Sequence, residues 1–263
     1  MNVIAVLNTG NDSDIIELNI RHNLNYLSKI VVIDNNSVDG TKNILEKLSL
    51  EFPNRLFVTN TISNTTLEHL FITNFIKQQI LDFDNPDYLL VIDADEFIKC
   101  EDLSELNSIP ENHVGIIKWK CYIPNQLDHK NFPEEMIYRR DHEPDGCHKV
   151  IMPRGVEGSL TLGNHYLHQG EDGHRAAMYE LKTIFLAHYP VRSITQINKK
   201  IEFISNLFKD LDKELAHQTR TYEKIETLEN LIDKAIVYST NDSETKHKFK
   251  VVLDPLINKN NNG

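Results

Sequence analysis

Two aspartates separated by one residue carry the clearest chemical signal in this sequence. Asp93 and Asp95 follow directly on the apolar run Tyr88–Ile92, where burying carboxylates without a cation would cost free energy. Oxygen ligands of this kind suit Mg²⁺ or Mn²⁺, which complete their coordination shells with waters and substrate phosphates. The pair therefore predicts a metal site for a phosphorylated ligand. The alternative is a solvated strand end, because Asp is common in turns.

Two other polar segments also follow apolar runs. Residues 9–12 come after the run Val3–Leu7, and residues 34–41 come after Ile30–Ile33. In open parallel sheets, ligands bind beyond the carboxyl ends of the strands. We therefore expect all three polar segments to lie at one edge of a sheet.

The elements that would hold these segments alternate between strands and helices. Short apolar runs predict strands at Val3–Leu7, Ile30–Ile33, Leu56–Val58, Tyr88–Ile92 and Ile116–Tyr122. Apolar residues at helical spacing predict helices through Ile15, Ile16, Leu18 and Ile20, through Ile44, Leu45 and Leu48, and through Leu67, Leu70, Phe71, Phe75 and Ile80. This order predicts an α/β fold, with a Rossmann-like, mostly parallel sheet flanked by helices.

The second half of the chain has a different pattern. From about residue 115 to residue 190, Pro, Gly and His recur every few residues, which indicates strands and loops in place of regular βα units. Ser193 and Gln196 then form a predicted capping box, and two helical patterns follow. We expect a C-terminal helical extension over residues 193–257 and a disordered tail over residues 258–263.

Composition excludes several classes of protein. With 28 Lys and Arg against 39 Asp and Glu, the net charge of −11 is too acidic for a nucleic-acid binder. Cys100, Cys121 and Cys147 form no CxxC pair, which argues against a disulfide framework or a structural zinc site and favours a cytoplasmic location. No apolar run reaches membrane-spanning length, so we expect no transmembrane segment. Peripheral attachment to the inner face of a membrane stays open.

Two segments resemble the signatures of family 2 glycosyltransferases of the GT-A fold. The segment YLLVIDADEF carries the DxD motif of that family. The segment VVIDNNSVDGT matches the family's Asp-x-x-Ser-x-Asp-Gly-Thr loop at Asp34, Ser37, Asp39, Gly40 and Thr41.

The chain is also similar to one subgroup of this family over about residues 1–201. The further matches are Glu17 and His22 in a Glu-x-x-x-x-His helix, Glu96 and Phe97 after the DxD motif, Lys149 in a strand before a proline, Gly163 and His165 in a Gly-x-His segment, and a late His-Tyr segment at residues 188–193. Several segments in the same order are more specific than any one of them.

The resemblance implies a GT-A domain over residues 1–192, with a nucleotide-binding half at 1–99 and an acceptor half at 100–192. It implies transfer of a sugar from a nucleoside-diphosphate sugar, with a UDP-sugar as the first expectation, to a hydroxyl of a glycan or lipid-linked glycan. Inversion of the anomeric centre and a role in bacterial surface polysaccharide synthesis are family expectations. The segment 9–11 departs from the family's Lys-Asn-Glu. The alternative is therefore a catalytically silent GT-A domain that binds a sugar or a protein. The sequence does not indicate an oligomeric state.

Residue roles follow from the same resemblance. Asp34 would lie near the base, Asp93 near the ribose, and Asp95 on Mn²⁺ or Mg²⁺. The implied metal ligands are Asp93, Asp95 and His188, with His165 as the alternative to His188. The other implied nucleotide-binding residues are Thr9, Asn11, Asn36 and Lys149.

An inverting reaction also needs a general base for the acceptor hydroxyl. Asp141, Glu143 and Asp145 fall in the right part of the chain, and one of these three is the expected base. Exposed loop carboxylates are the alternative interpretation of the same residues. We expect Trp119 and Tyr122 to belong to the core, because aromatic residues in strands usually do.

Overall fold

The computed structural model describes residues 1–63, 65–128, 132–170, 172–207, 225–238 and 249–256, with the backbone alone described over 201–207. The chain forms two compact units. The first contains residues 1–119 and 145–187, and the second contains residues 120–144 and 188–256. The boundary predicted between residues 192 and 193 stays a prediction, and the predicted tail at 258–263 lies outside the described residues.

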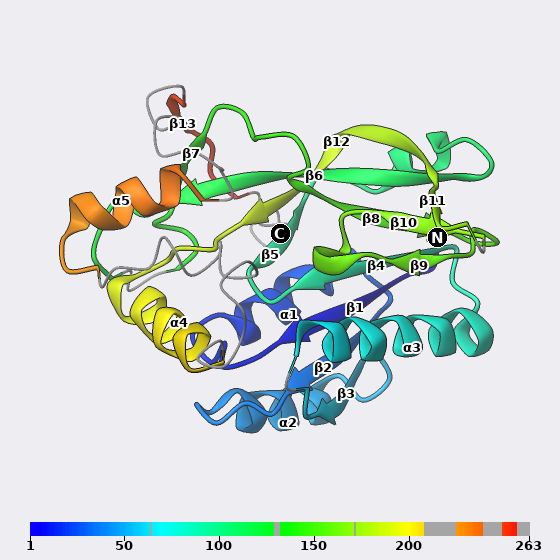
Figure 1. The fold of residues 1–263 in the computed structure, drawn as a ribbon, viewed down its shortest axis with the longest axis horizontal. Helices are drawn as coiled ribbons and strands as arrows, with labels where there is room; N and C mark the ends of the chain where they lie inside the picture. The colour runs from blue at the N-terminus through cyan, green and yellow to red at the C-terminus, as the bar shows by residue number, and fades with distance from the viewer. Residues whose placement is uncertain (64, 129–131, 171, 208–224, 239–248, 257–263) are drawn as a thin grey trace. The chain divides into compact units, whose positions relative to one another are not determined.

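The first unit is built on four parallel strands (Figure 1). Strands β1 (Val3–Thr9), β2 (Lys29–Asn35), β3 (Leu56–Thr61) and β4 (Tyr88–Asp93) lie in the order β3-β2-β1-β4. The helices α1 (Ile16–Asn23), α2 (Thr41–Glu51) and α3 (Thr66–Asp84) connect them. The fold class is therefore the α/β arrangement predicted from the sequence, with a mostly parallel sheet flanked by helices.

Antiparallel strands complete this unit. Strand β8 (His148–Pro153) pairs with β4, and the first part of β6 (His113–Ile123) pairs with β8. Strand β12 (Ala177–His188) pairs with β6 and with the short β5 (Glu96–Lys99). The remaining elements of the unit are the 3₁₀ helices η1 (Ser104–Ser108) and η2 (Leu162–Asn164) and a small sheet of β9 (Ser159–Leu160), β10 (Leu167–Gln169) and β11 (His174–Arg175).

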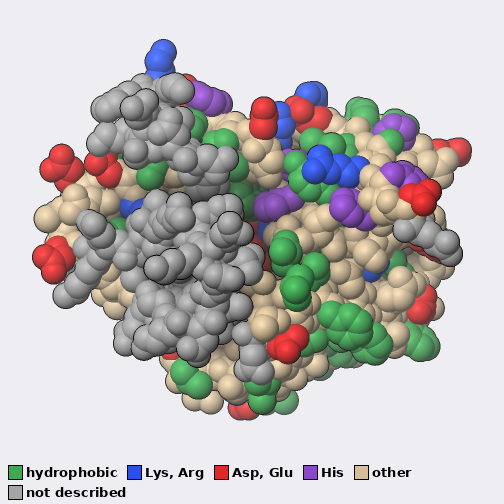
Figure 2. Space-filling view, viewed as in Figure 1, with side chains coloured by type: hydrophobic (Ala, Val, Ile, Leu, Met, Phe, Trp, Pro, Cys, Tyr) green, Lys and Arg blue, Asp and Glu red, His purple; other side chains and the backbone are tan. Residues whose placement is uncertain are grey.

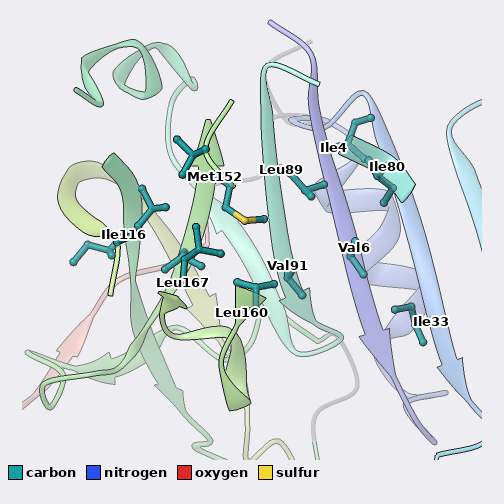
Figure 3. Close-up of a cluster of buried hydrophobic side chains, with 14 residues drawn as sticks. Ile4, Val6, Ile33, Ile80, Leu89, Val91, Ile116, Met152, Leu160 and Leu167 are labelled. Carbon is teal, nitrogen blue, oxygen red and sulfur yellow. The ribbon is translucent and has the colours of Figure 1, made fainter. Parts of the chain in front are cut away.

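The core of the first unit lies between the sheet and α3. Ile4 and Val6 of β1 and Leu89 and Val91 of β4 point to the same face, because alternate residues of a strand share a face. Together with Ile80 of α3 they form a buried cluster (Figure 3). Burial on both faces explains why these strands appear in the sequence as continuous apolar runs.

Helix α3 is where predicted, but the apolar stripe that indicated it lies mostly on the surface. Leu67, Phe71 and Phe75 are 67%, 73% and 54% exposed, and Figure 2 shows hydrophobic side chains over this part of the molecule. The helix buries Thr73 and Lys77 together with Ile80, the one residue of these that belongs to the predicted stripe. Spacing therefore identified the helix without identifying its buried face.

The second unit has its own core. It contains the end of β6, β7 (Tyr138–Arg140), β13 (Val251–Leu253), α4 (Ile194–Leu207) and α5 (Leu228–Ile236). Its buried apolar residues include Ile123, Val191, Ile197, Ile225, Leu231 and Ala235. The backbone N–H of Gln196 donates to Ser193 Oγ at 3.0 Å, which confirms the predicted cap of α4.

Two expectations about aromatic residues are confirmed. The exposed fractions of Trp119 and Tyr122 are 7% and 0%, so both belong to the core. The ring of Tyr122 stacks on Tyr189 with centroids 4.5 Å apart. Across the described residues, no helix is long and apolar enough to cross a membrane.

Candidate active site

The three polar segments predicted to meet lie at the same edge of the sheet. Strands β1, β2 and β4 are parallel and paired in register, with Thr9 opposite Asp34 and Asn8 opposite Asp93. Their carboxyl ends therefore bring the loops after residues 9, 35 and 93 together. This edge is the position at which open α/β sheets bind ligands.

The first two loops are joined by hydrogen bonds. The backbone N–H of Asn11 donates to Ser37 Oγ at 2.8 Å, and Asn11 Oδ1 accepts from the N–H of Val38 at 2.8 Å. Asn11 and Asn36 both adopt left-handed backbone conformations, with φ of 60° and 51°, which Asn tolerates better than other non-glycine residues. Both residues, predicted as nucleotide-binding, therefore shape the loops that line this edge.

Asp34 is fully buried and organises its own loop. Its Oδ1 accepts hydrogen bonds from the hydroxyl and the backbone N–H of Ser37. Downstream, burial raises the pKa of the Asp39 carboxyl, but hydrogen bonds from Thr41 and Ser13 outweigh it and lower that pKa overall. The carboxylates of Asp34 and Asp39 therefore hold the loop by accepting hydrogen bonds. Contact of Asp34 with the base of a nucleotide stays a prediction.

Two backbone N–H groups of the DxD turn have partners outside the turn's own backbone. The N–H of Ala94 donates to the carbonyl of Asn8 at 3.1 Å, and the N–H of Asp93 donates to Glu96 Oε2 at 2.9 Å. The side chain of Asp93 is 43% exposed, whereas Asp95 as a residue is 9% exposed. Glu96 is fully buried behind them.

A buried lysine reaches this turn from β8. Lys149 Nζ lies 2.6 Å from Asp93 Oδ2, 2.9 Å from the carbonyl of Gly163 and 3.5 Å from Glu96 Oε1. It also lies 5.7 Å from the centre of the Trp119 ring. The ammonium of Lys149 thus contacts groups of the DxD turn and the carbonyl of Gly163, and its predicted contact with the nucleotide stays a prediction.

The charges of this cluster follow from burial and pairing. Burial lowers the pKa of Lys149, but the nearby Asp93 and Glu96 outweigh this effect and raise it overall. Burial raises the pKa of Glu96 well above its ordinary value, and the opposing charge of Lys149 reduces that rise. The ion pair therefore joins the ammonium of Lys149 to the carboxylate of Asp93, and burial favours the neutral form of Glu96.

His165 lies in the same unit as the DxD turn. Its Nδ1 is 2.6 Å from the carbonyl of His148, so this nitrogen carries the proton, and its ring packs edge-on against Trp119 at 5.3 Å. Burial lowers the pKa of His165. A neutral imidazole whose Nδ1–H donates to a carbonyl leaves Nε2 with the lone pair that a metal ligand needs. These features suit His165 for the ligand role predicted as the alternative.

His188 belongs to the second unit. It is buried, its Nδ1 lies 3.4 Å from Cys121 Sγ, and its ring packs edge-on against Tyr238. Arg192, in the same unit, donates to the carbonyl of Tyr189 at 3.0 Å. A metal-binding role for His188 stays a prediction.

The three predicted bases have different surroundings. Glu143 accepts from the N–H of Cys121 at 2.7 Å and pairs with the fully buried guanidinium of Arg140. Asp141 is exposed and accepts from the N–H of Lys250 at 3.0 Å. Asp145 is exposed and belongs to the first unit. The ion pair of Glu143 favours a structural role, and the choice between Asp141 and Asp145 stays a prediction.

Several residues around the DxD turn were given no role from the sequence, although His22 matched the helix motif of the subgroup. Asn19, His22 and Asn23 of α1 and Tyr26 after it hydrogen-bond to the backbone that follows Asp93. Their spacing of three, four and seven residues was the available signal, because it places polar side chains on one face of a helix.

Comparison with known proteins gives similarity only at the level of solved structures. No family model and no curated protein sequence matches the chain. Among solved structures, the chain is similar to Staphylococcus aureus TarS, with a TM-score of 0.41 and 13% identity over 91% of this chain and 44% of that one. It is also similar to TarS 1-349 in complex with UDP, with a TM-score of 0.40 and 16% identity over 93% of this chain and 75% of that one. The chain thus spans less than half the length of the first of these two structures.

Proposed function

We propose that the chain is a metal-dependent glycosyltransferase that uses a nucleoside-diphosphate sugar, with a UDP-sugar as the expected donor. The observation that carries this proposal is the position of Asp93 and Asp95 at the carboxyl edge of a parallel sheet, beside the two loops joined by Asn11 and Ser37. The resemblance of these segments to family 2 glycosyltransferases supports the same conclusion. The expected acceptor is a hydroxyl of a glycan or lipid-linked glycan.

The residues at this edge fit a hard divalent cation. Mg²⁺ and related ions are commonly held by one or two carboxylates, with phosphate oxygens and waters as the other ligands. Asp95 and Asp93 would supply the carboxylates, and His165 of the same unit would supply a nitrogen, while the role of His188 stays a prediction. In the part of the chain that the structure describes, no group of three His, Cys, Asp or Glu side chains could hold a metal by itself. In the proposed site, diphosphate oxygens and waters would supply the remaining ligands.

When bound, the cation would offset the charge that develops on the leaving diphosphate. The chain's own residues do the rest. The loops at residues 9–12 and 34–41 form the floor beneath the nucleoside, and Lys149 neutralises Asp93 so that two carboxylates can face an anionic ligand. One of the loop carboxylates accepts the proton of the acceptor hydroxyl in the inverting reaction.

Ligand-induced thermal stabilisation tests this proposal, because a ligand that binds only the folded state raises the melting temperature. The purified protein is heated with UDP, GDP, CMP or dTDP, each with and without Mn²⁺. We expect a shift for one nucleotide that requires Mn²⁺ and is lost in Asp95→Asn. The exposed Asp128 provides the matched control variant Asp128→Asn, which should keep the shift. No shift with any pair would contradict the proposal.

Turnover gives a second measure. Removing one electrostatic stabiliser of a transition state lowers kcat by roughly 10²–10³, so we expect a loss of this size for hydrolysis or transfer of the donor by Asp95→Asn. Turnover equal to that of the unchanged protein would show that the metal site lies elsewhere in the chain.

A second candidate is a catalytically silent domain that binds a sugar or a protein. The observation that favours it is the engagement of Glu143 with Arg140, which leaves two exposed carboxylates as candidates for the base. Binding of a nucleotide without turnover of any nucleotide sugar would support this alternative.

A further inference from the structure

Strand β5, which follows the DxD turn, has a strand as partner on one side and side chains of a helix on the other. Among the described strands, it pairs with β12. On the opposite side, backbone groups of residues 94–100 are bonded by polar side chains of α1 and the turn that follows it. A helix face thus takes the place of a neighbouring strand.

The bonds nearest the catalytic edge come from two asparagines. Asn19 Nδ2 donates to the carbonyl of Ala94 at 2.9 Å and to that of Glu96 at 2.7 Å. Asn23 Nδ2 donates to the carbonyl of Glu96 at 3.1 Å, and Asn23 Oδ1 accepts from the N–H of Ile98 at 2.8 Å. The two amides are also bonded to each other at 3.0 Å.

Two further side chains bond to backbone carbonyls farther from the turn. His22 Nε2 lies 2.7 Å from the carbonyl of Ile98, and the hydroxyl of Tyr26 donates to the carbonyl of Cys100 at 3.1 Å. The four partners are thus the carbonyls of residues 94, 96, 98 and 100, which face the same side of an extended chain. Asn19 and Asn23 alone reach the carbonyls that flank Asp95.

The chemistry of these two positions requires an amide. The turn presents two carbonyls that need donors and, at Ile98, an N–H that needs an acceptor. Both asparagines are 0% exposed, so water cannot supply these bonds, and an unpaired buried carbonyl or N–H is costly. A carboxylate could only accept, and an aliphatic side chain could do neither.

We infer that Asn19 and Asn23 are positioning residues that fix the backbone on both sides of Asp95, and so hold Asp93 and Asp95 in the geometry that binds the cation and its diphosphate. The inference rests on the proposed function for its last step. The first step, that these asparagines hold the turn, stands on the hydrogen bonds alone.

A purely structural role and a positioning role predict different measurements. A purely structural role would lower the stability of every variant in this series. A positioning role would in addition lower the metal affinity, most strongly for the residues nearest the turn. Partners that orient metal ligands typically affect metal affinity or activity by about 10–100-fold when removed. We therefore expect a loss of this size in Mn²⁺ affinity, measured with UDP present, for Asn19→Ala and for Asn23→Asp.

Two controls separate the explanations. Tyr26→Phe removes a bond of the same series to the carbonyl of Cys100, directly after β5. Asn25→Ala removes an exposed asparagine that donates to the carbonyls of Arg21 and His22. Both controls should keep the Mn²⁺ affinity of the unchanged protein within about twofold, against the 10–100-fold loss expected for the positioning residues.

The experiment combines Mn²⁺ titration by electron paramagnetic resonance with hydrogen–deuterium exchange of residues 92–100 in the metal-free folded protein. Faster exchange of this segment in Asn19→Ala and Asn23→Asp, together with weaker Mn²⁺ binding, supports the inference. If Asn19→Ala does not fold, Asn23→Asp, which keeps the side-chain shape and the acceptor for Ile98, decides the question.

Failure of the inference and failure of the proposed function are distinguishable. Unchanged Mn²⁺ affinity in folded Asn23→Asp, with binding by the unchanged protein, would overturn the inference alone. If the unchanged protein binds no Mn²⁺ with any nucleotide, the proposed function fails. Exchange then decides the remaining step: faster exchange in the variants supports the role of the asparagines in holding the turn, and equal exchange overturns it.

Discussion

The ion pair between Lys149 and Asp93 can be tested by replacing Lys149 with Met, which keeps the length of the side chain and removes its charge. The exposed fractions of the two side chains are 1% for Lys149 and 43% for Asp93. Breaking a fully buried pair by removing one partner costs about 3–5 kcal/mol. Water can reach Asp93 once the lysine is gone, so we expect a smaller loss of unfolding free energy, about 2–3 kcal/mol at neutral pH.

The matched control is a second buried lysine of this unit. Lys77 is 2% exposed, and its ammonium donates to the carbonyl of Gly158. Burial lowers the pKa of Lys77, whereas the pKa of Lys149 is raised by its carboxylate neighbours. Lys77→Met removes a desolvated charge and leaves one carbonyl unpaired, so these effects partly cancel, and we expect a loss below about 1 kcal/mol.

Urea denaturation measures both losses. The single tryptophan, Trp119, lies 5.7 Å from Lys149 Nζ and reports the unfolding of this region by fluorescence. In an Asp93→Asn background, Lys149→Met should cost less by about 1 kcal/mol, because the two residues interact directly. Equal losses for the two lysine variants, or no difference between backgrounds, would refute the assignment of the stabilisation to this ion pair.

Three further predictions concern pH, backbone conformation and a buried hydroxyl. Burial lowers the pKa of His22 in the folded protein. Below about pH 6.5 the unfolded chain therefore binds the proton more tightly, and the unfolding free energy decreases as the pH decreases. His22→Gln should flatten this slope between about pH 7 and pH 5 in urea titrations, and an unchanged slope would contradict the assignment. Gly163 has a φ of 73°, and an added Cβ would lie 2.5 Å from His165 Nε2. Gly163→Ala should therefore lower the unfolding free energy by at least about 1 kcal/mol, and a thermal melt measures this loss. The Tyr122 hydroxyl donates to the carbonyl of Asp254 at 2.6 Å, so Tyr122→Phe should cost about 1–2 kcal/mol in the same melt, and a loss near zero would show that this bond contributes nothing.

Local patterns in the sequence were sufficient to locate the edge at which the candidate site lies. The runs before Thr9, Asp34 and Asp93 are apolar and separated by helical patterns, and a βαβ order makes such strands parallel. Parallel strands bring their carboxyl ends to one edge, so the meeting of these three segments follows from the order of elements alone. The observed register confirms it.

The contacts inside the site could not be predicted in the same way. Lys149 is 56 residues from Asp93 in the chain and reaches it because β8 pairs antiparallel with β4, a pairing that no local pattern specifies. Asn19 and Asn23 could not be identified from the sequence, because their partners are backbone groups near a distant strand, and such contacts do not affect the pattern of side chains. Where polar groups satisfy one another across the fold, hydrophobic periodicity carries no information about them.

The charge balance of the cluster leads to a last prediction, which rests on the proposed function. Lys149 Nζ pairs with Asp93 at 2.6 Å, and Glu96 is fully buried beside this pair. Carboxylates of this kind hold Mg²⁺ and related ions together with phosphate oxygens and waters, and an anionic diphosphate that approached the carboxylates without a cation would be repelled. Metal and nucleotide should therefore bind together: in calorimetric titrations, Mn²⁺ alone should bind at least about tenfold more weakly than Mn²⁺ with UDP, and by linkage UDP should gain the same factor from Mn²⁺. Equal Mn²⁺ affinity with and without the nucleotide would show that the chain's own side chains complete the metal site.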